Sequence, residues 1–204
     1  SKLLAEMSEG VASTFVTNDA GHWLARGRNL VEAIPMLRAQ ALEAKRSSRW
    51  LPNDNSEVAN LLYTSAVSTE HIIVQVRGIS RTLFDLSIEG GVPERVRRDL
   101  ALALSTASYA VADKIESNEL ETIADELRAA SNLLRDNVIK STELIEKEVV
   151  VKLLAMVSSF EVIADSLDES APAITEVLTP DEPASNKIIE TGPIRKFVKK
   201  LLRR

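Results

Sequence analysis

Residues 58–86 read VANLLYTSAVSTEHIIVQVRGISRTLFDL and contain the strongest periodic pattern of the chain. Nine positions in this stretch lie alternately four and three residues apart: Val58, Leu62, Ser65, Thr69, Ile72, Val76, Ile79, Leu83 and Leu86. This heptad-like spacing is typical of one long helix whose apolar side packs against other helices. We therefore expect a central helix here, with Ile72, Val76 and Ile79 buried in the core.

Upstream of this stretch the sequence predicts two helical regions. Residues 2–16 carry apolar side chains at helical spacing, and a break or kink is expected at 17–21, where Thr17 begins a run that can cap a helix. A second pattern runs from Trp23 to about Arg49. Pro35 lies inside that pattern and should kink the helix or mark a second start.

Downstream, Gly90-Gly91-Val92-Pro93 should end the long helix and place Pro93 in the first turn of the next one, which runs to about residue 115. Ser117-Asn118 can cap a further helix with an apolar stripe from 120 to 138. The stripe at 145–167 is out of phase with it. Either Ser141 or Thr142 caps a separate helix, or one helix continues through a stutter. We expect the break.

The composition favours an all-helical protein. Of the 204 residues, 45% are hydrophobic but only 4% are aromatic, so the core must consist mainly of Leu, Ile, Val and Ala. We predict an all-α, elongated bundle of four to six long helices in residues 1–168. Residues 169–192 lose the periodicity and mix Pro with Asp and Glu, which predicts an irregular acidic linker.

The last twelve residues form a basic amphipathic segment. They contain six cations and no acid, while residues 1–192 have a net charge of −11. Apolar residues recur at helical spacing, so a helix here would have one apolar and one cationic face. We expect this tail to contact an anionic lipid surface, an acidic partner or the acidic body itself. The candidate contact residues are Ile194, Arg195, Lys196, Phe197, Val198, Lys199, Lys200, Leu201, Leu202, Arg203 and Arg204.

The sequence does not indicate an enzyme. His22 and His71 are the only histidines, and neither belongs to a pair with metal-ligand spacing. There is no cysteine and no phosphate-binding or nucleophile motif, so we expect no cofactor, no metal and no catalytic residue. An acidic body also argues against nucleic-acid binding. Trp23 and Trp50 are more readily explained by packing at the ends of a helix than by ligand stacking.

Arg77, Arg81 and Asp85 are the one distinctive charged group within a helix. They lie four residues apart, so they share a helix face, and Asp85 can pair with Arg81. Gly78 in mid-helix costs about 1 kcal/mol relative to Ala, which suggests that a neighbouring helix approaches closely there. The two arginines are either anion- or carboxylate-binding groups or an exposed ladder beside the core.

Two motifs carry a family resemblance. Arg49-Trp50-Leu51-Pro52, followed by a helix with Gln75-Val76-Arg77-Gly78-Ile79-Ser80-Arg81-Thr82-Leu83, resembles the C-terminal cytoplasmic region of actinobacterial fusaric-acid-resistance-like (aromatic acid exporter) membrane proteins. Leu51 stands where those proteins have Asn. The resemblance covers about residues 25–115. It implies a transmembrane domain upstream of Ser1, a location at the cytoplasmic face of the inner membrane, and proton-driven efflux of small aromatic or amphipathic acids.

The sequence itself contains no membrane-spanning run, because its longest uncharged stretch, residues 100–112, is too short. The expected function is the cytoplasmic assembly or regulatory domain of an inner-membrane efflux transporter. The alternative is a stand-alone helical scaffold or adaptor that docks on membranes or protein partners through its basic tail. The sequence leaves open whether the bundle forms a homo-oligomer and what the transporter would carry.

Overall fold

The computed structural model describes residues 1–13, 15–48, 54–113 and 120–178, and every regular element in them is a helix. The prediction of an all-α bundle is therefore confirmed. The helices are α1 (Lys2–Ser13), α2 (Thr17–Glu32), α3 (Ile34–Ser48), α4 (Asp54–Glu89), α5 (Glu94–Asp113), α6 (Leu120–Lys140) and α7 (Lys147–Leu178). Because a single residue separates α2 from α3, the two form one kinked rod.

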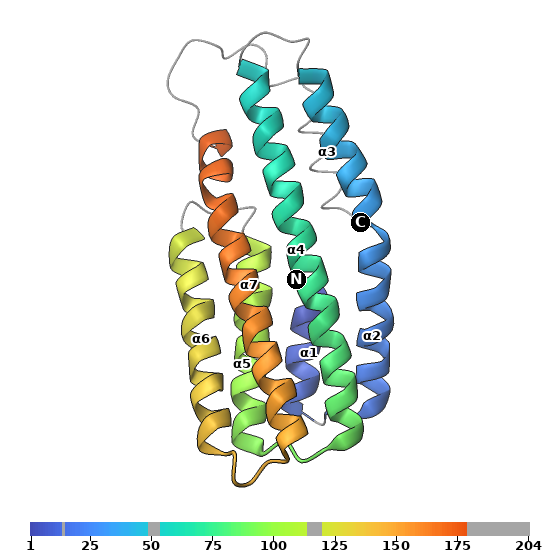
Figure 1. The fold of residues 1–204 in the computed structure, drawn as a ribbon, viewed down its shortest axis with the longest axis vertical. Coiled ribbons are helices and arrows are strands. Elements are labelled where there is room, and N and C mark those ends of the chain that lie inside the picture. Colours follow the sequence, from blue (N-terminus) through green and yellow to red (C-terminus); the bar gives the residue numbers. More distant parts are fainter. Residues whose placement is uncertain (14, 49–53, 114–119, 179–204) are drawn as a thin grey trace.

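The helices run roughly along one axis and pack around a shared core (Figure 1). α4 packs against α2, α3 and α7, while α6 lies between α7 and α5, and α5 packs against α1. With 36 residues, α4 is about 54 Å long. α3 and the upper part of α4 extend beyond the ends of α1, α5 and α6 (Figure 1).

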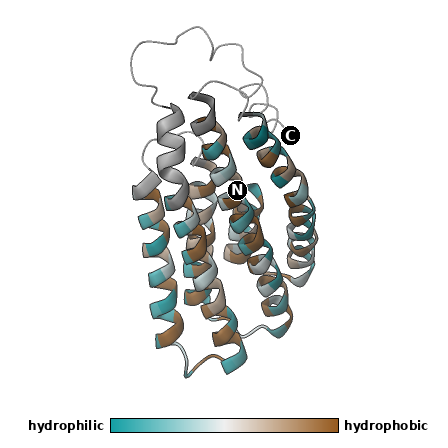
Figure 2. Cartoon of the chain, turned by 45° about the horizontal axis from the view of Figure 1, so that its top comes forward, coloured by the Kyte–Doolittle hydropathy of each residue, from teal (hydrophilic) through white to brown (hydrophobic). Residues whose placement is uncertain are grey.

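The core is aliphatic, as the composition predicts. Ile72, Val76 and Ile79 are at most 5% exposed, and Leu83 and Leu86 are fully buried. The opposing helices contribute Leu, Ile, Val, Met and Ala, with Phe160 as the largest fully buried side chain. Apolar and polar segments alternate along each helix in Figure 2, as expected for helices with one buried side.

The first half of the heptad pattern in α4, residues 58–69, is less buried than the second half, residues 72–86. Val58, Leu62, Ser65 and Thr69 are only half-buried, although they continue the same heptad pattern. This part of α4 lies beyond the ends of α1, α5 and α6 (Figure 1), so fewer helices can cover it. The buried residues in this part of α4 are instead Ala59, Ala66 and Ser68, so the heptad pattern predicted burial correctly only in the lower part.

α1 and α2 are separate helices, as expected, but the break lies between Ser13 and Thr17, and residues 17–21, where it was expected, begin α2. Val16, and not Thr17, occupies the N-cap position of α2, and no side chain caps that helix. The Thr17 hydroxyl instead donates a 3.0 Å hydrogen bond to the Ser87 carbonyl at the end of α4. Thr17 thus links two helices that are far apart in the sequence.

The expected disturbance at Pro35 is a helix start. Ala33 ends α2, and Pro35 is the second residue of α3. A proline is tolerated in a first turn because the N–H that it lacks would have no partner inside the helix. α3 ends at Ser48, close to the predicted end at Arg49.

Two glycines with positive φ, Gly90 at 71° and Gly91 at 76°, form the turn after α4. Residues with a Cβ rarely adopt this conformation, so the Gly-Gly pair accounts for the helix end. Pro93 directly precedes α5, and its carbonyl accepts the Arg97 N–H at 2.9 Å. The predicted role of Pro93 at the start of this helix agrees with its observed place.

The chain also breaks between α6 and α7, as expected. However, neither Ser141 nor Thr142 caps α7, which begins at Lys147. The Thr142 hydroxyl instead donates to the Ile139 carbonyl at the end of α6. These residues terminate one helix, because short hydroxyl side chains bond nearby carbonyls as readily as they cap a following helix.

The boundary predicted at residue 168 is wrong, because α7 continues to Leu178 and residues 169–178 are helical. The well-packed lower part of α7 provides the helix nucleus, and the helix continues past Pro172 although an interior proline removes one backbone hydrogen bond. The remainder of the expected linker, the basic tail, the Trp50-Leu51-Pro52 turn and the Ser117-Asn118 cap lie outside the described residues.

Candidate functional site

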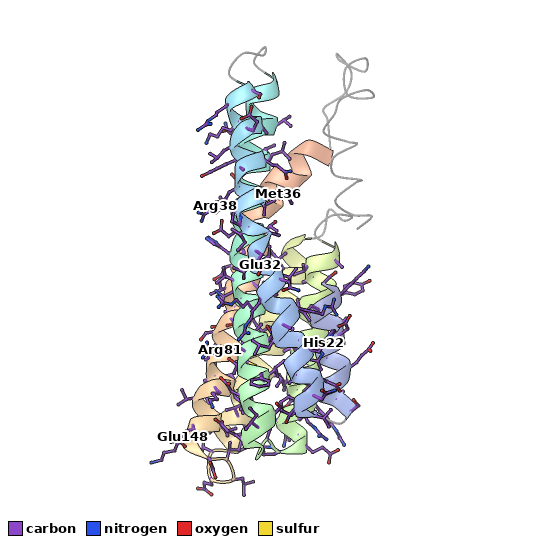
Figure 3. The ribbon with its side chains drawn as sticks, turned by 90° about the vertical axis from the view of Figure 1, so that its right-hand side faces the viewer. His22, Glu32, Met36, Arg38, Arg81 and Glu148 are labelled. Atoms are coloured by element: carbon purple, nitrogen blue, oxygen red, sulfur yellow. The ribbon has the colours of Figure 1, made fainter. Side chains whose placement is uncertain are left out.

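Arg77 and Arg81 lie on the surface of α4, on the side opposite the core. Their neighbours Val76 and Ile79 point into the core, which turns the two arginines outward. In Figure 3 Arg81 lies along the same edge of the molecule as Arg38, and His22 lies on the other side. Both guanidinium groups are thus presented to solvent from a rigid helix.

The expected pairing of these arginines within the bundle is not found. Among the described residues, no ion pair joins Arg77 or Arg81 to a carboxylate, and Asp85 does not bond Arg81. Exposure explains this result, because water solvates a surface guanidinium at little cost. Arg77 and Arg81 are therefore exposed cations on α4, and Asp85 beside them is half-buried.

Gly78 is also not the site of close helix packing that the sequence suggested. A Cβ built on Gly78 would meet no atom within 4 Å in the described structure. The close approach occurs at Gly27 in α2, where a Cβ would lie 2.4 Å from the Ser80 Oγ and 3.4 Å from the Arg77 Cα. The missing side chain of Gly27 therefore allows α2 to pack against the backbone of α4.

An open groove lies between α1 and α2. It is lined by Glu6, Glu9, Gly10, Ser13, Thr17, Asn18, Asp19, Gly21, His22 and Trp23. Glu6 is bonded to Arg26, whereas Glu9, Asp19 and His22 are exposed. The groove is polar and acidic, and it holds no cluster of groups arranged for acid–base chemistry.

Trp23 forms part of this groove and is not a free stacking platform. The indole is 4% exposed and packs on Gly10, where an added Cβ would lie 2.3 Å from a ring carbon. The packing interpretation of Trp23 is thus supported. A glycine opposite a tryptophan 13 residues later gives no periodic signal, so the sequence alone could not show this contact.

The densest polar cluster connects α6 to α7 and was not foreseen. Arg128 bonds Asp165 at 2.8 Å, Asp125 at 3.2 Å, and also Asp168. These hydrogen bonds, that to Asp165 first, raise the pKa of the Arg128 guanidinium above its usual range. A permanently charged group held by three carboxylates serves to clamp two helices together.

Similar contacts attach the other helices. Arg38 in α3 forms a bidentate pair with Glu70 in α4, with the Nε–Oε2 bond at 2.6 Å, and the pKa of Arg38 is raised mainly by this bond. The Lys45 ammonium lies 4.5 Å from the centre of the Tyr63 ring. These polar groups are all engaged in holding helices together.

The described residues offer no group of three or more acidic, His or Cys side chains that could bind a metal, and both histidines are exposed. Within the same residues, no helix is long and apolar enough to cross a bilayer. The tail residues proposed for membrane or partner contact lie beyond Leu178, outside the described structure.

Comparison with known proteins finds no matching family model, no matching curated protein and no matching solved structure.

Proposed function

We propose that this chain is the cytoplasmic assembly or regulatory domain of an inner-membrane efflux transporter for small aromatic or amphipathic acids, and that it contacts the bilayer through residues 193–204. The observation that carries this proposal is the charge asymmetry of the sequence. Twelve residues hold six cations and no acid, behind a body with a net charge of −11. Segments next to the cytoplasmic leaflet favour Lys and Arg in this way.

The energetics of the tail are compatible with reversible lipid binding. Twelve residues are too few for a stable helix in water. Each Lys or Arg near an anionic bilayer contributes about 1 kcal/mol, and the apolar face adds burial of Phe197 and Leu201. Lipid can therefore offset the entropy lost when the segment becomes ordered.

Residues 75–83, which carry part of the resemblance to the exporter family, support a role in contacts with partners. Val76, Ile79 and Leu83 fill the core, while Arg77 and Arg81 remain at the surface of the same helix turns. The buried side of this stretch can stabilise the fold while its exposed arginines remain available to contact a partner. This supports an assembly role more than a chemical one.

Vesicle flotation tests the membrane part of the proposal. The chain should bind anionic vesicles, binding should weaken with salt, and truncation after Thr191 should abolish it. A matched control replaces the six tail cations by Gln and keeps the apolar residues, which separates charge from hydrophobicity. Equal binding to neutral vesicles would remove the electrostatic argument, and binding to neither would refute the membrane contact.

The transporter part needs a test in cells. The reading frame upstream of Ser1 should encode several hydrophobic spans, and loss of residues 193–204 from that protein should reduce export of small aromatic acids. A start codon directly before Ser1 would instead favour the stand-alone adaptor.

A further inference from the structure

The outer face of α5 and α6 exposes large apolar side chains from two adjacent helices. Leu102 on α5 is 48% exposed and Leu133 on α6 is 44% exposed. α5 and α6 pack side by side, on the side of the bundle away from α2 and α3 (Figure 1). Tyr109, 70% exposed, lies two turns beyond Leu102 on the same side of α5.

A hydrogen bond fixes the register of these two helices. The Asn137 amide on α6 donates to the Asp99 carboxylate on α5 at 2.7 Å. Leu102 follows Asp99 by three residues and Leu133 precedes Asn137 by four, so each shares a helix face with its bonded neighbour. Because the helices are antiparallel, both leucines lie about one turn from this bond in the same direction, and hence at the same level.

Charged residues flank this leucine pair in a definite order. On α5, Arg95 lies seven residues before Leu102, and on α6, Glu126 lies seven residues before Leu133 and Lys140 seven after it. All three are exposed and form no ion pair in the described structure. We call the six residues Arg95, Leu102, Tyr109, Glu126, Leu133 and Lys140 the α5–α6 face.

The levels of these residues follow from helix geometry. Seven residues rise about 10.5 Å. Arg95 and Lys140 therefore lie about 10.5 Å on one side of the leucine level, and Tyr109 and Glu126 lie about 10.5 Å on the other side. The face is apolar at its centre, cationic at one end, and acidic and aromatic at the other.

We infer that a second copy of this chain binds the α5–α6 face, related by a two-fold axis that crosses the helices at the level of Leu102 and Leu133. This axis makes the contacting helices antiparallel. It brings Glu126 opposite Lys140 of the other copy and Arg95 opposite Tyr109 of the other copy, while each leucine meets its own equivalent. The contacts are ion pairs, cation–π contacts and apolar packing, each of which occurs twice.

The charge order selects this arrangement over the other two-fold solution. A two-fold axis parallel to the helices would instead place α5 opposite α6 of the second copy, and Arg95 beside Lys140 of that copy. That contact is repulsive and leaves Glu126 beside Tyr109. A like-charge contact of this kind is the usual means by which interfaces reject a wrong orientation.

The local electrostatics of α5 also favour an acidic group from outside. Arg95, Arg97 and Arg98 all lie in the first turn and a half of α5, at the positive end of the helix dipole. Glu94 pairs with Arg98 only. An additional carboxylate near this end would relieve the remaining repulsion, and the two-fold axis brings Glu126 of the second copy to the level of Arg95.

The available area is sufficient for a specific dimer. Helices of 20 and 21 residues are about 30 Å long, and two adjacent helices are about 20 Å wide. The face can therefore bury about 600 Å² per copy, or about 1,200 Å² in total, which is at the lower limit of stable specific interfaces. We expect a reversible dimer whose population depends on protein concentration.

Cysteine cross-linking gives a direct test, since the chain contains no cysteine. Leu102→Cys or Leu133→Cys places one thiol near the two-fold axis, so mild oxidation should produce a covalent dimer in good yield. Val74→Cys, at a comparably exposed position on α4, is the matched control and should remain monomeric. Equal cross-linking of all three variants, or none at 102 and 133, would overturn the assignment.

A charge exchange tests the orientation. In sedimentation velocity, Glu126→Lys should weaken dimerisation by about tenfold or more, because both symmetry-related ion pairs that flank the leucines become repulsive contacts. Lys140→Glu alone should do the same, and the double variant should restore association. Failure of the double variant to recover, with unchanged helical content by circular dichroism, would refute the antiparallel arrangement.

This inference is independent of the membrane proposal. The chain truncated after Thr191 lacks the basic tail but keeps the complete α5–α6 face, so it should still dimerise. A single-chain mass at all concentrations would refute the dimer and leave the lipid-binding test unaffected. Loss of lipid binding would equally leave the dimer test unaffected.

Discussion

Replacing Gly27 and Gly78 by Ala should change stability in opposite directions. Both glycines lie inside helices, and an interior Gly→Ala change stabilises a helix by about 1 kcal/mol when the new methyl group has room. At Gly78 there is open space, since no atom lies within 4 Å of an added Cβ. Gly78→Ala should therefore raise the free energy of unfolding by about 1 kcal/mol, equivalent to a Tm about 2–4 °C higher for a chain of this size.

Gly27→Ala gains the same helix propensity but creates a collision. The added Cβ would lie 2.4 Å from the Ser80 Oγ, and Ser80 is fully buried. Overpacking of this kind costs about 1–3 kcal/mol, so the net effect ranges from about zero to a loss of about 2 kcal/mol. The two alanine variants should therefore differ by about 1–3 kcal/mol in chemical denaturation.

Ser80→Ala provides the decisive control. It removes the Oγ, which bonds only to the Val76 and Arg77 carbonyls of its own helix, and leaves 3.4 Å as the shortest remaining contact of the new methyl group. In that background Gly27→Ala should become neutral or stabilising, which gives a coupling energy of at least about 1 kcal/mol in a double-mutant cycle. Additive effects of the two changes would refute the close approach of α2 to α4. A destabilising Gly78→Ala would show that Gly78 has a contact absent from the described residues.

Three further changes test other parts of the bundle. Ile79→Ala empties a fully buried site and should cost about 2–5 kcal/mol in urea denaturation; a loss below about 0.5 kcal/mol would contradict its place in the core. Arg128→Met leaves three neighbouring carboxylates without their shared cation and should lower the Tm at low ionic strength, less so in high salt, whereas an unchanged melting curve would mean that the cluster adds nothing to stability. Gly10→Ala should displace the buried Trp23 indole and red-shift its fluorescence when measured in a Trp50→Phe background; an unshifted spectrum would contradict the packing of the indole on Gly10.

Much of the fold could be predicted from the sequence because helix packing leaves a periodic signal. The positions of Ile72, Val76 and Ile79 are set by a spacing that matches the helix turn, so their burial follows from the pattern alone. The turn at Gly90-Gly91 could be predicted for a similar reason, since few other residues adopt positive φ.

The predictions that failed concern contacts between residues far apart in the sequence, which the local sequence does not indicate. Thr17 has the right chemistry for a helix cap, but a carbonyl 70 residues away accepts its hydrogen bond. Gly78 and Gly27 look equivalent in sequence, and only the path of the neighbouring helix decides which one is in close contact. Likewise, nothing in the spacing of Arg128 indicates that two of its three carboxylates come from another helix.

The exposed surface required the structure for a further reason. Leu102 and Leu133 lie on two different helices, and each alone is an exposed leucine of a kind that is common on protein surfaces. They become a candidate interface for two reasons that the structure supplies. The Asn137–Asp99 bond places the two leucines at one level, and the residues on one side of that level are cationic while those on the other are acidic and aromatic. Core residues recur at helical spacing within each helix, so the sequence of that helix alone shows them. A surface made by two helices depends on how the helices are placed relative to each other, so it can be recognised only in the folded structure.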